Sequence, residues 1–555
     1  MKPHPDDPTG SSALSRRDLL RIGASSGAAV TVAALLPGPK AVASEPPQAA
    51  GSGLPPFELE ETTVVELQAA MQAGKHTARS LAEAYLGRIA AFDNRLHAVI
   101  ETNPEALAIA DALDAERKAK GPRGPLHGIP VLIKDNIGTF DRMETTAGSL
   151  ALLGVRPAQD ATVAARLRAA GAVILGKTNL SEWANFRSTR SSSGWSGRGG
   201  QCRNPYALDR SPCGSSSGSG AAIAANFAAI GVGTETDGSV VCPSATCGIV
   251  GVKPTLGLVS RAGIVPIAHS QDTAGPMCRT VADAAALLSA LAGVDPRDGA
   301  TAAAAGKATD YTRFLDPSGL KGARLGIPRK RLFGYSTQAD ELAQEAIADL
   351  KRLGAVIVDP ADIPHYGDYD AAEFEVLLYE FKADLEAYLG SLPSGPYPRT
   401  LKDLIDFNEK HKAQELPYFG QEIFLDAAKK GPLTDRAYLK ALEKCRKLSR
   451  FRGLDEVFEA HKLDALVAPT GGPAWTIDLV NADHYLGSAS TPAAVSGYPH
   501  ITVPCGYTFG LPLGLSFFGP AWSEPTLFKL AFAYEQATKH RRPARLLPTA
   551  DVSPR

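Results

Sequence analysis

Several classes of protein are excluded by what this 555-residue sequence lacks. The formal net charge is −1, so nothing indicates a surface for nucleic acid or for a polyanionic substrate. Seven cysteines are present, but no CxxC pair and no HExxH motif occurs, which argues against a zinc site. No internal repeat is visible, and we expect neither a metal nor another cofactor.

The composition that remains is typical of a folded globular protein. Hydrophobic residues make up 44% and charged residues 21% of a chain that is long enough to bury a large core. Because free cysteine is among the most buried residue types, we expect buried thiols. The alternative is one or two disulfides, near Cys202 and Cys213 or near Cys242 and Cys247.

The N-terminus has the order of regions that is typical of an export signal. Residues 15–20 (SRRDLL) contain a twin-arginine pattern, and residues 22–36 form a weakly apolar run that is too short to span a bilayer. A small-x-small cleavage site follows at residues 41–43 (AVA). We therefore predict a signal peptide over residues 1–43, and a periplasmic or secreted mature protein without a stable membrane anchor. The precursor would have the twin-arginine export machinery as its partner, and folding before export weakens the disulfide alternative.

The mature chain alternates predicted strands and helices. A linker over residues 44–56 precedes one predicted domain over residues 57–547, in which residues 290–460 are rich in helices. Capping residues and hydrophobic periodicity predict helices over residues 62–73, 77–91, 104–120, 160–170 and 220–229, and strands over residues 96–100, 128–135, 172–176, 230–234, 320–327, 355–358, 463–468, 500–504 and 514–518. This alternation predicts an α/β protein with helices on both faces of a sheet.

Residues suited to catalysis gather between positions 128 and 255. Lys134 ends an apolar run, and burial of its ammonium group would favour the neutral amine, which can act as a base. A loop rich in Ser and Gly, residues 213–220 (CGSSSGSG), precedes a predicted helix. The turn of residues 233–239 (GTETDGS) follows a predicted strand and offers backbone N–H groups that could hold an oxyanion beside Ser239.

The loop rich in Ser and Gly also permits other interpretations. A flexible turn is one, and a phosphate-binding loop is another, although the Lys-Ser/Thr pair of a P-loop is absent. Residues 214–218 match the G-x-S-x-G nucleophile elbow with Ser216 at its centre, but that elbow needs a strand directly upstream, where a loop is predicted. An α/β-hydrolase esterase of this kind would need an essential histidine from among His269, His365, His411, His461, His484 and His500.

Taken in this order, the three elements resemble the amidase signature family. The further matching segments are residues 128–134, 176–179 (GKTN), 204–205 (NP), 248–255 (GIVGVKPT) and 510–519 (GLPLGLSFFG). The resemblance implies a single α/β domain with a large, mixed, twisted sheet of about eleven strands between helical layers, and a signature core over about residues 128–280. It also implies a Ser-Ser-Lys triad whose nucleophile lies 24 residues beyond the bridging serine, which selects Ser215 and Ser239.

The resemblance further implies that a carboxamide is hydrolysed to carboxylate and ammonia through an acyl-serine intermediate. Ser239 attacks the carbonyl, and Ser215, which usually lies on a cis peptide in this family, relays the proton to neutral Lys134. Lys134 then returns a proton to the leaving amine. The oxyanion hole would consist of the backbone N–H groups of Thr236, Asp237, Gly238 and Ser239.

Three departures from the family pattern bear on the substrate. Ser217 replaces a glycine after the serine pair, and Asp237 replaces a glycine in the oxyanion turn, although its N–H can still donate. Val241 stands where many members carry arginine. Because this removes one candidate anchor for a carboxylate, a neutral terminus is the expected ligand.

Part of the pattern is most similar to bacterial peptide amidases. The segments concerned are residues 192–196 (SSGWS) and 234–239. They imply the C-terminal amide of a peptide as the substrate. Within the loop of residues 187–200, which is rich in hydroxyl groups, Trp195 is expected to form an apolar wall, and Ser216 is a further candidate for substrate contact.

Other functions remain open at this point. A general amidase of the same family would accept small aliphatic or aryl amides. The amidotransferase subunit that acts on misacylated tRNA shares the signature, but it works inside the cell with partner subunits, and the export signal argues against it. A binding protein that has kept the fold without the activity is the last alternative.

Overall fold

The first helices begin at the capping residues that the sequence indicates. In the computed structural model of the protein, the Thr63 hydroxyl accepts a hydrogen bond from the Glu66 N–H at 3.3 Å, and the Glu66 carboxylate accepts one from the Thr63 N–H at 2.8 Å. This reciprocal capping box starts α1 (Val64–Gln72), and a second one starts α2 (Ala78–Leu96). Local sequence therefore defines where these helices begin.

The structure describes residues 54–553, which belong to one compact unit. The predicted signal peptide and most of the predicted linker lie outside the described residues. Within the described range, no helix has the length and the apolar character that are needed to cross a membrane.

The helices lie between and around the strands along the whole described chain. Those not yet named are α3 (Ala106–Lys120), α4 (Thr162–Ala169), α5 (Ser217–Ala224), α6 (Val241–Thr246), α7 (Val281–Leu291), α8 (Thr337–Arg352), α9 (Asp370–Ser391), α10 (Leu401–Lys410), α11 (Lys412–Glu415), α12 (Glu422–Ala428), α13 (Arg436–Arg446), α14 (Asp455–His461), α15 (Thr491–Ser496) and α16 (Glu524–Thr538).

The main sheet has eleven strands in the order β1-β3-β2-β6-β8-β7-β12-β13-β11-β9-β10. Pairing is parallel through β3-β2-β6 and through β11-β9-β10, and antiparallel elsewhere, so the predicted mixed sheet is confirmed. The strands are β1 (Val99–Thr102), β2 (Pro130–Lys134), β3 (Val173–Thr178), β6 (Ile230–Glu235), β7 (Val250–Lys253), β8 (Thr273–Cys278), β9 (Arg324–Gly326), β10 (Val356–Val358), β11 (Ala465–Pro469), β12 (His500–Thr508) and β13 (Leu511–Phe518). A separate pair is formed by β4 (Trp195–Ser196) and β5 (Gly200–Gln201).

Two elements differ from their prediction for identifiable reasons. The strand expected over residues 96–100 starts at Val99, because α2 continues to Leu96 and His97 ends it in a left-handed conformation. Strand β8 has no counterpart among the predicted strands. It contains Pro276 in the middle of the sheet, and proline normally argues against a central strand.

Helix α5 explains why residues 213–220 are rich in serine and glycine. All eight of its residues are buried, and the helix starts at Ser217, before the predicted residue 220. A Cβ atom on Gly218 would clash with the carbonyl oxygens of Ala98 and Asn179. Only small side chains allow this close approach, so the segment is a packed helix rather than a linker.

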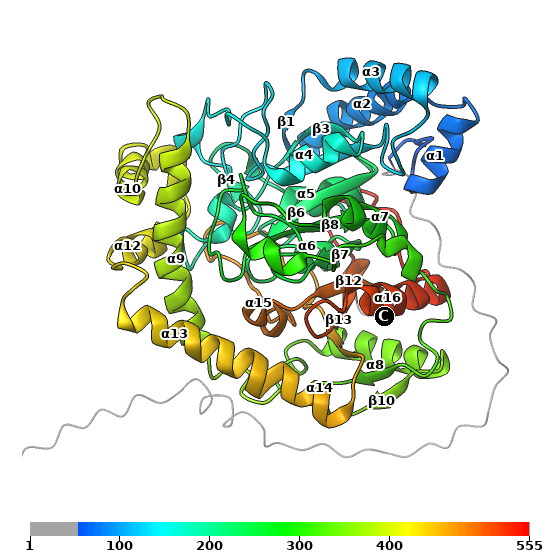
Figure 1. Ribbon diagram of the computed structural model, residues 1–555, viewed down its shortest axis with the longest axis vertical. Coiled ribbons are helices and arrows are strands. Elements are labelled where there is room, and N and C mark those ends of the chain that lie inside the picture. The colour runs from blue at the N-terminus through cyan, green and yellow to red at the C-terminus, as the bar shows by residue number, and fades with distance from the viewer. Residues whose placement is uncertain (1–53, 554–555) are drawn as a thin grey trace, which may run out of the picture. The chain divides into compact units, whose positions relative to one another are not determined.

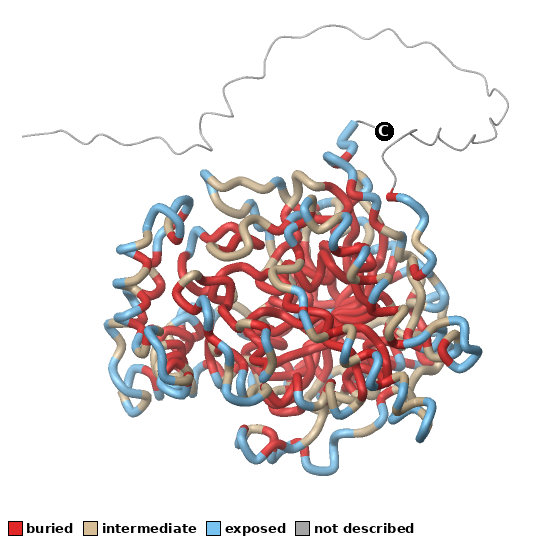
Figure 2. The backbone as a smooth tube through the Cα atoms, turned by 90° about the horizontal axis from the view of Figure 1, so that it is seen from above, coloured by how far each residue is buried: buried red, intermediate tan, exposed pale blue. Residues whose placement is uncertain are grey.

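Helices cover the sheet and bury its strands (Figure 1). Helices α5 and α6 pack against each other and against central strands, while α7 and α16 form a second such pair. The backbone in the middle of the folded part is buried, and exposed segments lie around it (Figure 2). The sheet therefore provides a rigid, water-free support for side chains at its edges.

A helical region between residues 370 and 461 lies beside this core (Figure 1, yellow). Helices α9, α10 and α12 form an apolar cluster of their own around Phe381 and Phe424. The cluster also contains Trp183, Phe186 and Ile267, which come from loops near the edge of the sheet. The helical region is thus packed onto those loops and fixes their positions.

Candidate active site

The parallel pairing of two strands brings the sequence-predicted residues to one edge of the sheet. Strand β2 lies beside β6, with Ile133 opposite Val232. Because parallel strands end at the same edge, Lys134 at the end of β2 lies next to the turn that follows Glu235. This edge is where ligand sites of open α/β sheets lie.

The amino group of Lys134 is surrounded by oxygen atoms. Its Nζ lies 2.7 Å from Ser215 Oγ, 2.9 Å from Thr234 Oγ1 and 3.3 Å from Thr234 O, and the residue is fully buried. Burial lowers the pKa of Lys134 to about 7, although the negative charges of Asp272 and Glu235 oppose this shift. A neutral amine here can donate two N–H groups to the Thr234 oxygens and accept the Ser215 hydroxyl proton.

Ser215 lies on a cis peptide bond just before α5. The bond between Gly214 and Ser215 is cis, as the family resemblance implies. A Cβ atom on Gly214 would clash with Ser181 Oγ, so only glycine fits there. The Ser216 N–H donates to the Ser239 carbonyl oxygen at 3.2 Å, which brings the two serine loops together.

A buried glutamate shapes the turn after β6. Glu235 Oε2 accepts hydrogen bonds from the N–H groups of Val240 at 2.8 Å and Val241 at 3.0 Å. Gly238 has a φ of 79°, a left-handed conformation that favours glycine. Within residues 54–553, no acceptor takes a hydrogen bond from the backbone N–H groups of residues 236–239. These four donors remain free for a developing oxyanion.

The outer side of the same turn is held by Asp272. The Thr236 hydroxyl donates to Asp272 Oδ1 at 2.6 Å, and Asp272 Oδ2 accepts from the N–H groups of Ile267 at 2.8 Å and Ala268 at 3.0 Å. Burial raises the pKa of Asp272 to about 6. At neutral pH this carboxylate is mostly ionised, and it contributes the negative charge that Lys134 feels.

A disulfide joins the two serine loops. It links Cys213, just before Ser215, to Cys242, just after Ser239, with the Cα atoms 6.0 Å apart. The expectation of thiols alone is wrong for this pair, and the bond takes one cysteine from each of the two groups considered in the sequence. Packing of the two loops, not proximity in sequence, brings the partners together. The free, buried thiols are those of Cys202, Cys247, Cys278, Cys445 and Cys505.

A cavity of 480 Å³ opens at Ser239. Its lining residues include two carboxylates and, among the described residues, no Lys, Arg or His. Hydroxyl, aromatic and apolar side chains form the rest of the wall. The lining residues are Ala184, Asn185, Phe186, Ser188, Thr189, Ser191, Ser193, Cys213, Gly214, Thr236, Asp237, Gly238, Ser239, Cys242, Ile267, Leu377, Trp475, Ala482, Asp483, Tyr485, Ser490 and Thr491.

The loop rich in hydroxyl groups reaches this cavity but is partly occupied by other contacts. Ser188 Oγ and Thr189 Oγ1 donate to the Glu422 carboxylate at 2.6 and 2.9 Å, which ties the loop to α12. The Ser193 N–H donates to Asp483. Fewer of these groups are therefore available to a substrate than the sequence suggests.

Two candidates for substrate contact do not line the cavity. Trp195 is only 5% exposed and packs edge-on against Phe419, with ring centroids 5.2 Å apart, so it belongs to the interior. Ser216 is fully buried, and its hydroxyl donates to Thr234 O at 3.0 Å and accepts from Thr234 N at 3.2 Å. The aromatic wall is formed instead by Trp475, which no sequence signal indicates.

The geometry does not fit a nucleophile elbow centred on Ser216. The nearest preceding strand is β5, which ends at Gln201, so a long loop separates it from the serine. None of the candidate histidines lines the cavity at Ser239. His500 is fully buried, and its Nε2 lies 2.6 Å from Ser516 Oγ.

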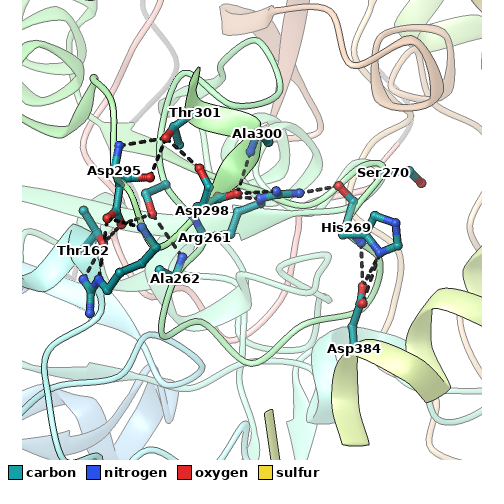
Figure 3. Close-up of polar contacts among 12 residues, drawn as sticks. Thr162, Arg261, Ala262, His269, Ser270, Asp295, Asp298, Ala300, Thr301 and Asp384 are labelled. Atoms are coloured by element: carbon teal, nitrogen blue, oxygen red, sulfur yellow. Dashed lines mark hydrogen bonds and ion pairs between the residues drawn. The ribbon is translucent and has the colours of Figure 1, made fainter. Parts of the chain in front are cut away.

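A second cavity of 580 Å³ adjoins the first and shares three lining residues with it. Its charged side chains are paired (Figure 3): Arg261 donates to Asp298, and His269 Nδ1 lies 2.9 Å from Asp384 Oδ2. With Glu380, the last two residues place three potential metal ligands within 4.8 Å of one another. Both ring nitrogens already face carboxylates, which raise the pKa of His269, so an imidazolium ion suits this group better than a metal.

Some residues at the triad were missed by sequence reasoning. Thr234 holds Lys134 through two oxygens, and Asn136 Nδ2 donates to Thr234 Oγ1 at 2.9 Å. Glu235 anchors the nucleophile turn. Thr234 and Glu235 lie inside the quoted GTETDGS segment, so the motif contained them without revealing their contacts.

Comparison with known proteins identifies the family. The family model named amidase matches residues 80–528, which is most of the chain. The chain belongs to the amidase family. A probable amidase of Arabidopsis thaliana is 45% identical to this amidase over 502 residues, with 88% of this chain and 93% of the relative covered.

Two further relatives differ in what their names say they do. The peptide amidase of Stenotrophomonas maltophilia has a crystal structure that matches with a TM-score of 0.85 and 54% identity, covering 88% of this amidase and 100% of that chain. A glutamyl-tRNA(Gln) amidotransferase polypeptide of Chloroflexus aurantiacus is 37% identical over 513 residues, covering 88% of this amidase and 99% of the relative. This amidase is thus a hydrolase of amide bonds in a family characterised by a Ser-Ser-Lys triad.

Proposed function

We propose that this amidase hydrolyses the unsubstituted C-terminal carboxamide of peptides to carboxylate and ammonia. The observation that carries the proposal is the cavity at Ser239, whose described lining has no Lys, Arg or His. A peptide that ends in a carboxylate would need a cationic partner there, whereas a neutral carboxamide does not. The 54% identity to a protein named peptide amidase supports the same substrate.

Acylation follows from the contacts at the triad. Ser239 Oγ attacks the carbonyl carbon, and its proton passes to Ser215 Oγ while the Ser215 proton passes to neutral Lys134. The tetrahedral oxyanion accepts hydrogen bonds from the N–H groups of residues 236–239, where one good donor is worth about 3 kcal/mol. When the C–N bond breaks, Lys134 returns the proton through Ser215 to the leaving nitrogen, so that ammonia leaves.

Deacylation repeats the same proton transfers with water. A water molecule attacks the acyl-Ser239 ester and gives its proton through Ser215 to Lys134, which then protonates Ser239 Oγ as the ester bond breaks. The peptide acid is released and the enzyme returns to its starting state. Lys134 must be neutral at the start of each half-reaction, which its lowered pKa allows near neutral pH.

The size of the cavity favours a peptide over a small amide. A volume of 480 Å³ lies within the range of about 300–1,000 Å³ that holds ligands of drug size. Trp475, Leu377 and Tyr485 offer apolar surface to the chain that precedes the scissile amide. A small aliphatic amide would leave most of this wall without contact.

Export is a separate proposal that rests on the sequence alone. The twin-arginine pattern of residues 15–20 is read by a receptor, so Arg16→Lys with Arg17→Lys should trap the precursor in the cytoplasm. Fractionation of cells that express the full chain checks this. Unchanged delivery of mature protein outside the inner membrane would refute the proposal.

The substrate is tested by comparing kcat/KM for four compounds. These are a peptide amide, a simple aliphatic amide, an aryl amide and a peptide in which only internal amide bonds are present. The proposal expects the peptide amide to be hydrolysed fastest, with ammonia as product. Equal turnover of the small amides would indicate a general amidase, and cleavage of internal bonds would show that the site accepts a bulky leaving group.

A further inference from the structure

The nucleophile turn carries a carboxylate where the family pattern has a glycine. Asp237 lies two residues before Ser239 and lines the same cavity. Its Oδ2 accepts a hydrogen bond from Thr491 Oγ1 at 2.7 Å. Its Oδ1 is buried, and no residue of the described chain hydrogen-bonds to it. The carboxylate is therefore held at the cavity wall with one oxygen unsatisfied.

A second carboxyl group, that of Glu373, lies behind the turn and interacts with Asp237. Burial and the negative charge of Asp237 hold the pKa of Glu373 well above its usual range. Burial also raises the pKa of Asp237, but hydrogen bonds and the charge of Lys253 oppose that rise. The first proton taken up by the pair therefore binds to Glu373, which leaves Asp237 ionised at neutral pH. Gln271 Nε2 donates to Glu373 Oε1 at 3.0 Å and keeps the pair in place.

No described cation on the cavity wall offsets this charge. The second carboxylate of the wall is Asp483, which accepts hydrogen bonds from the Ser193 N–H and from Trp475 Nε1. A neutral carboxamide meets no charge repulsion from these groups. The carboxylate product meets two negative charges, and only one of its oxygens can occupy the oxyanion hole.

We propose that Asp237 is a specificity-determining residue whose carboxylate makes the cleft bind a neutral carboxamide in preference to the carboxylate product. The charge weakens binding of the acid and so speeds its release after each turnover. The inference rests on the proposed reaction, because it concerns the acid that amide hydrolysis forms. Its chemical prediction is a cleft that discriminates ligands by charge at the scissile end.

The test compares two ligands that differ only in that charge. A peptide acid and the matching peptide alcohol, which is neutral and cannot be hydrolysed, are titrated calorimetrically into the mature enzyme at pH 8. The wild-type enzyme should bind the alcohol more tightly. Asp237→Asn should reduce the ratio of the two dissociation constants by about tenfold, which corresponds to about 1.4 kcal/mol. An unchanged ratio in a folded Asp237→Asn protein would overturn the proposal.

A matched control separates charge from structure. Thr491→Val removes the hydroxyl that positions Asp237 but keeps the carboxylate, so the ratio should stay near the wild-type value. If Thr491→Val changed the ratio as much as Asp237→Asn, the effect would be structural and the proposal would fail. Asp237→Ser serves if the asparagine variant does not fold. Equal binding of acid and alcohol by the wild-type enzyme would also refute it.

The outcome is distinguishable from failure of the proposed function. Calorimetry needs no turnover, so it tests the charge discrimination even if another amide proves to be the substrate. Absence of peptide-amide hydrolysis, with the acid still bound more weakly than the alcohol, would overturn the substrate and leave the role of Asp237 standing. Rapid peptide-amide turnover with an equal affinity for acid and alcohol would do the reverse.

Discussion

The triad end and the outer end of the cleft are built in different ways. At the triad, Lys134 and Ser215 are fully buried and their polar contacts are made by strands and turns within residues 128–255. The outer wall is assembled from loops and helices that are far apart in sequence, such as Trp475 and Leu377, and it remains partly exposed. The chemistry thus depends on one contiguous segment, whereas the choice of substrate depends on how distant segments pack.

The largest expected effect comes from breaking the triad end. Ser239→Ala should lower kcat/KM by at least about 10⁴-fold without unfolding the protein, because it removes the covalent nucleophile. Ser216→Ala is the matched control, since its hydroxyl is also buried but bonds only to the Thr234 backbone. Steady-state kinetics on a peptide amide checks both variants. An inactive Ser216 variant beside an active Ser239 variant would contradict the assignment of the triad.

The disulfide between the serine loops should matter more for stability than for chemistry. Cys213→Ser combined with Cys242→Ser opens a link across 29 residues, and loop-closure entropy gives about 3 kcal/mol for a loop of that length. Unfolding in denaturant should therefore shift to lower concentration, while kcat changes little because the contacts of Lys134 do not involve sulfur. The double variant of two buried free thiols, Cys278→Ser and Cys505→Ser, controls for loss of cysteine alone. Unchanged unfolding in the first double variant would count against a structural role for the bond.

Two tryptophans should separate the interior from the cleft wall. Trp475→Ala removes apolar surface from the wall and should raise KM for a peptide amide by about tenfold with little change in kcat. Trp195→Ala should instead lower the melting temperature, because this side chain is buried against Phe419, and should leave KM near its original value. Kinetics and thermal unfolding of both variants make the test. The opposite assignment of effects would restore Trp195 as the substrate wall.

The smallest expected effect is a shift in pH dependence. Only neutral Lys134 accepts the Ser215 proton, so kcat/KM should rise with pH around a midpoint of about 7, and be lost as the lysine protonates at lower pH. The Asp272 carboxylate raises the pKa of Lys134, so Asp272→Asn should move the midpoint to lower pH. Thr236→Val removes the hydrogen bond to Asp272 and keeps its charge, so its midpoint should stay closer to the original. A shift to higher pH in Asp272→Asn would show that the sign of this interaction is wrong.

The same contrast explains what could be predicted from the sequence. The segments around Lys134, Ser215 and Ser239 are motifs of fixed spacing, and the mixed sheet follows from the family that they indicate. Helices with capping boxes and the apolar strands were predicted with errors of a few residues. Strand β8 was missed because its residues, which include Gly275 and Pro276, carry no strand signal of their own and are held by their neighbours.

The outer wall could not be predicted in this way. Trp195 was preferred because it lies within a loop near the motifs, yet side-chain direction turns it into the interior. Trp475 lies more than 200 residues beyond Ser239, and only the packing of the chain brings it to the cavity. The Cys213–Cys242 bond has the same origin. Long-range packing, for which one sequence offers no pattern, decides each of these contacts.

The most direct test of the central claim is identification of the residue that forms the covalent intermediate. The mature enzyme is labelled with a fluorophosphonate probe at pH 8, digested, and the modified peptide is sequenced by mass spectrometry. The account predicts a single label on Ser239, and no label in the Ser239→Ala and Lys134→Ala variants. A label on Ser216, or labelling of the Ser239→Ala variant at the rate of the wild-type enzyme, would contradict it.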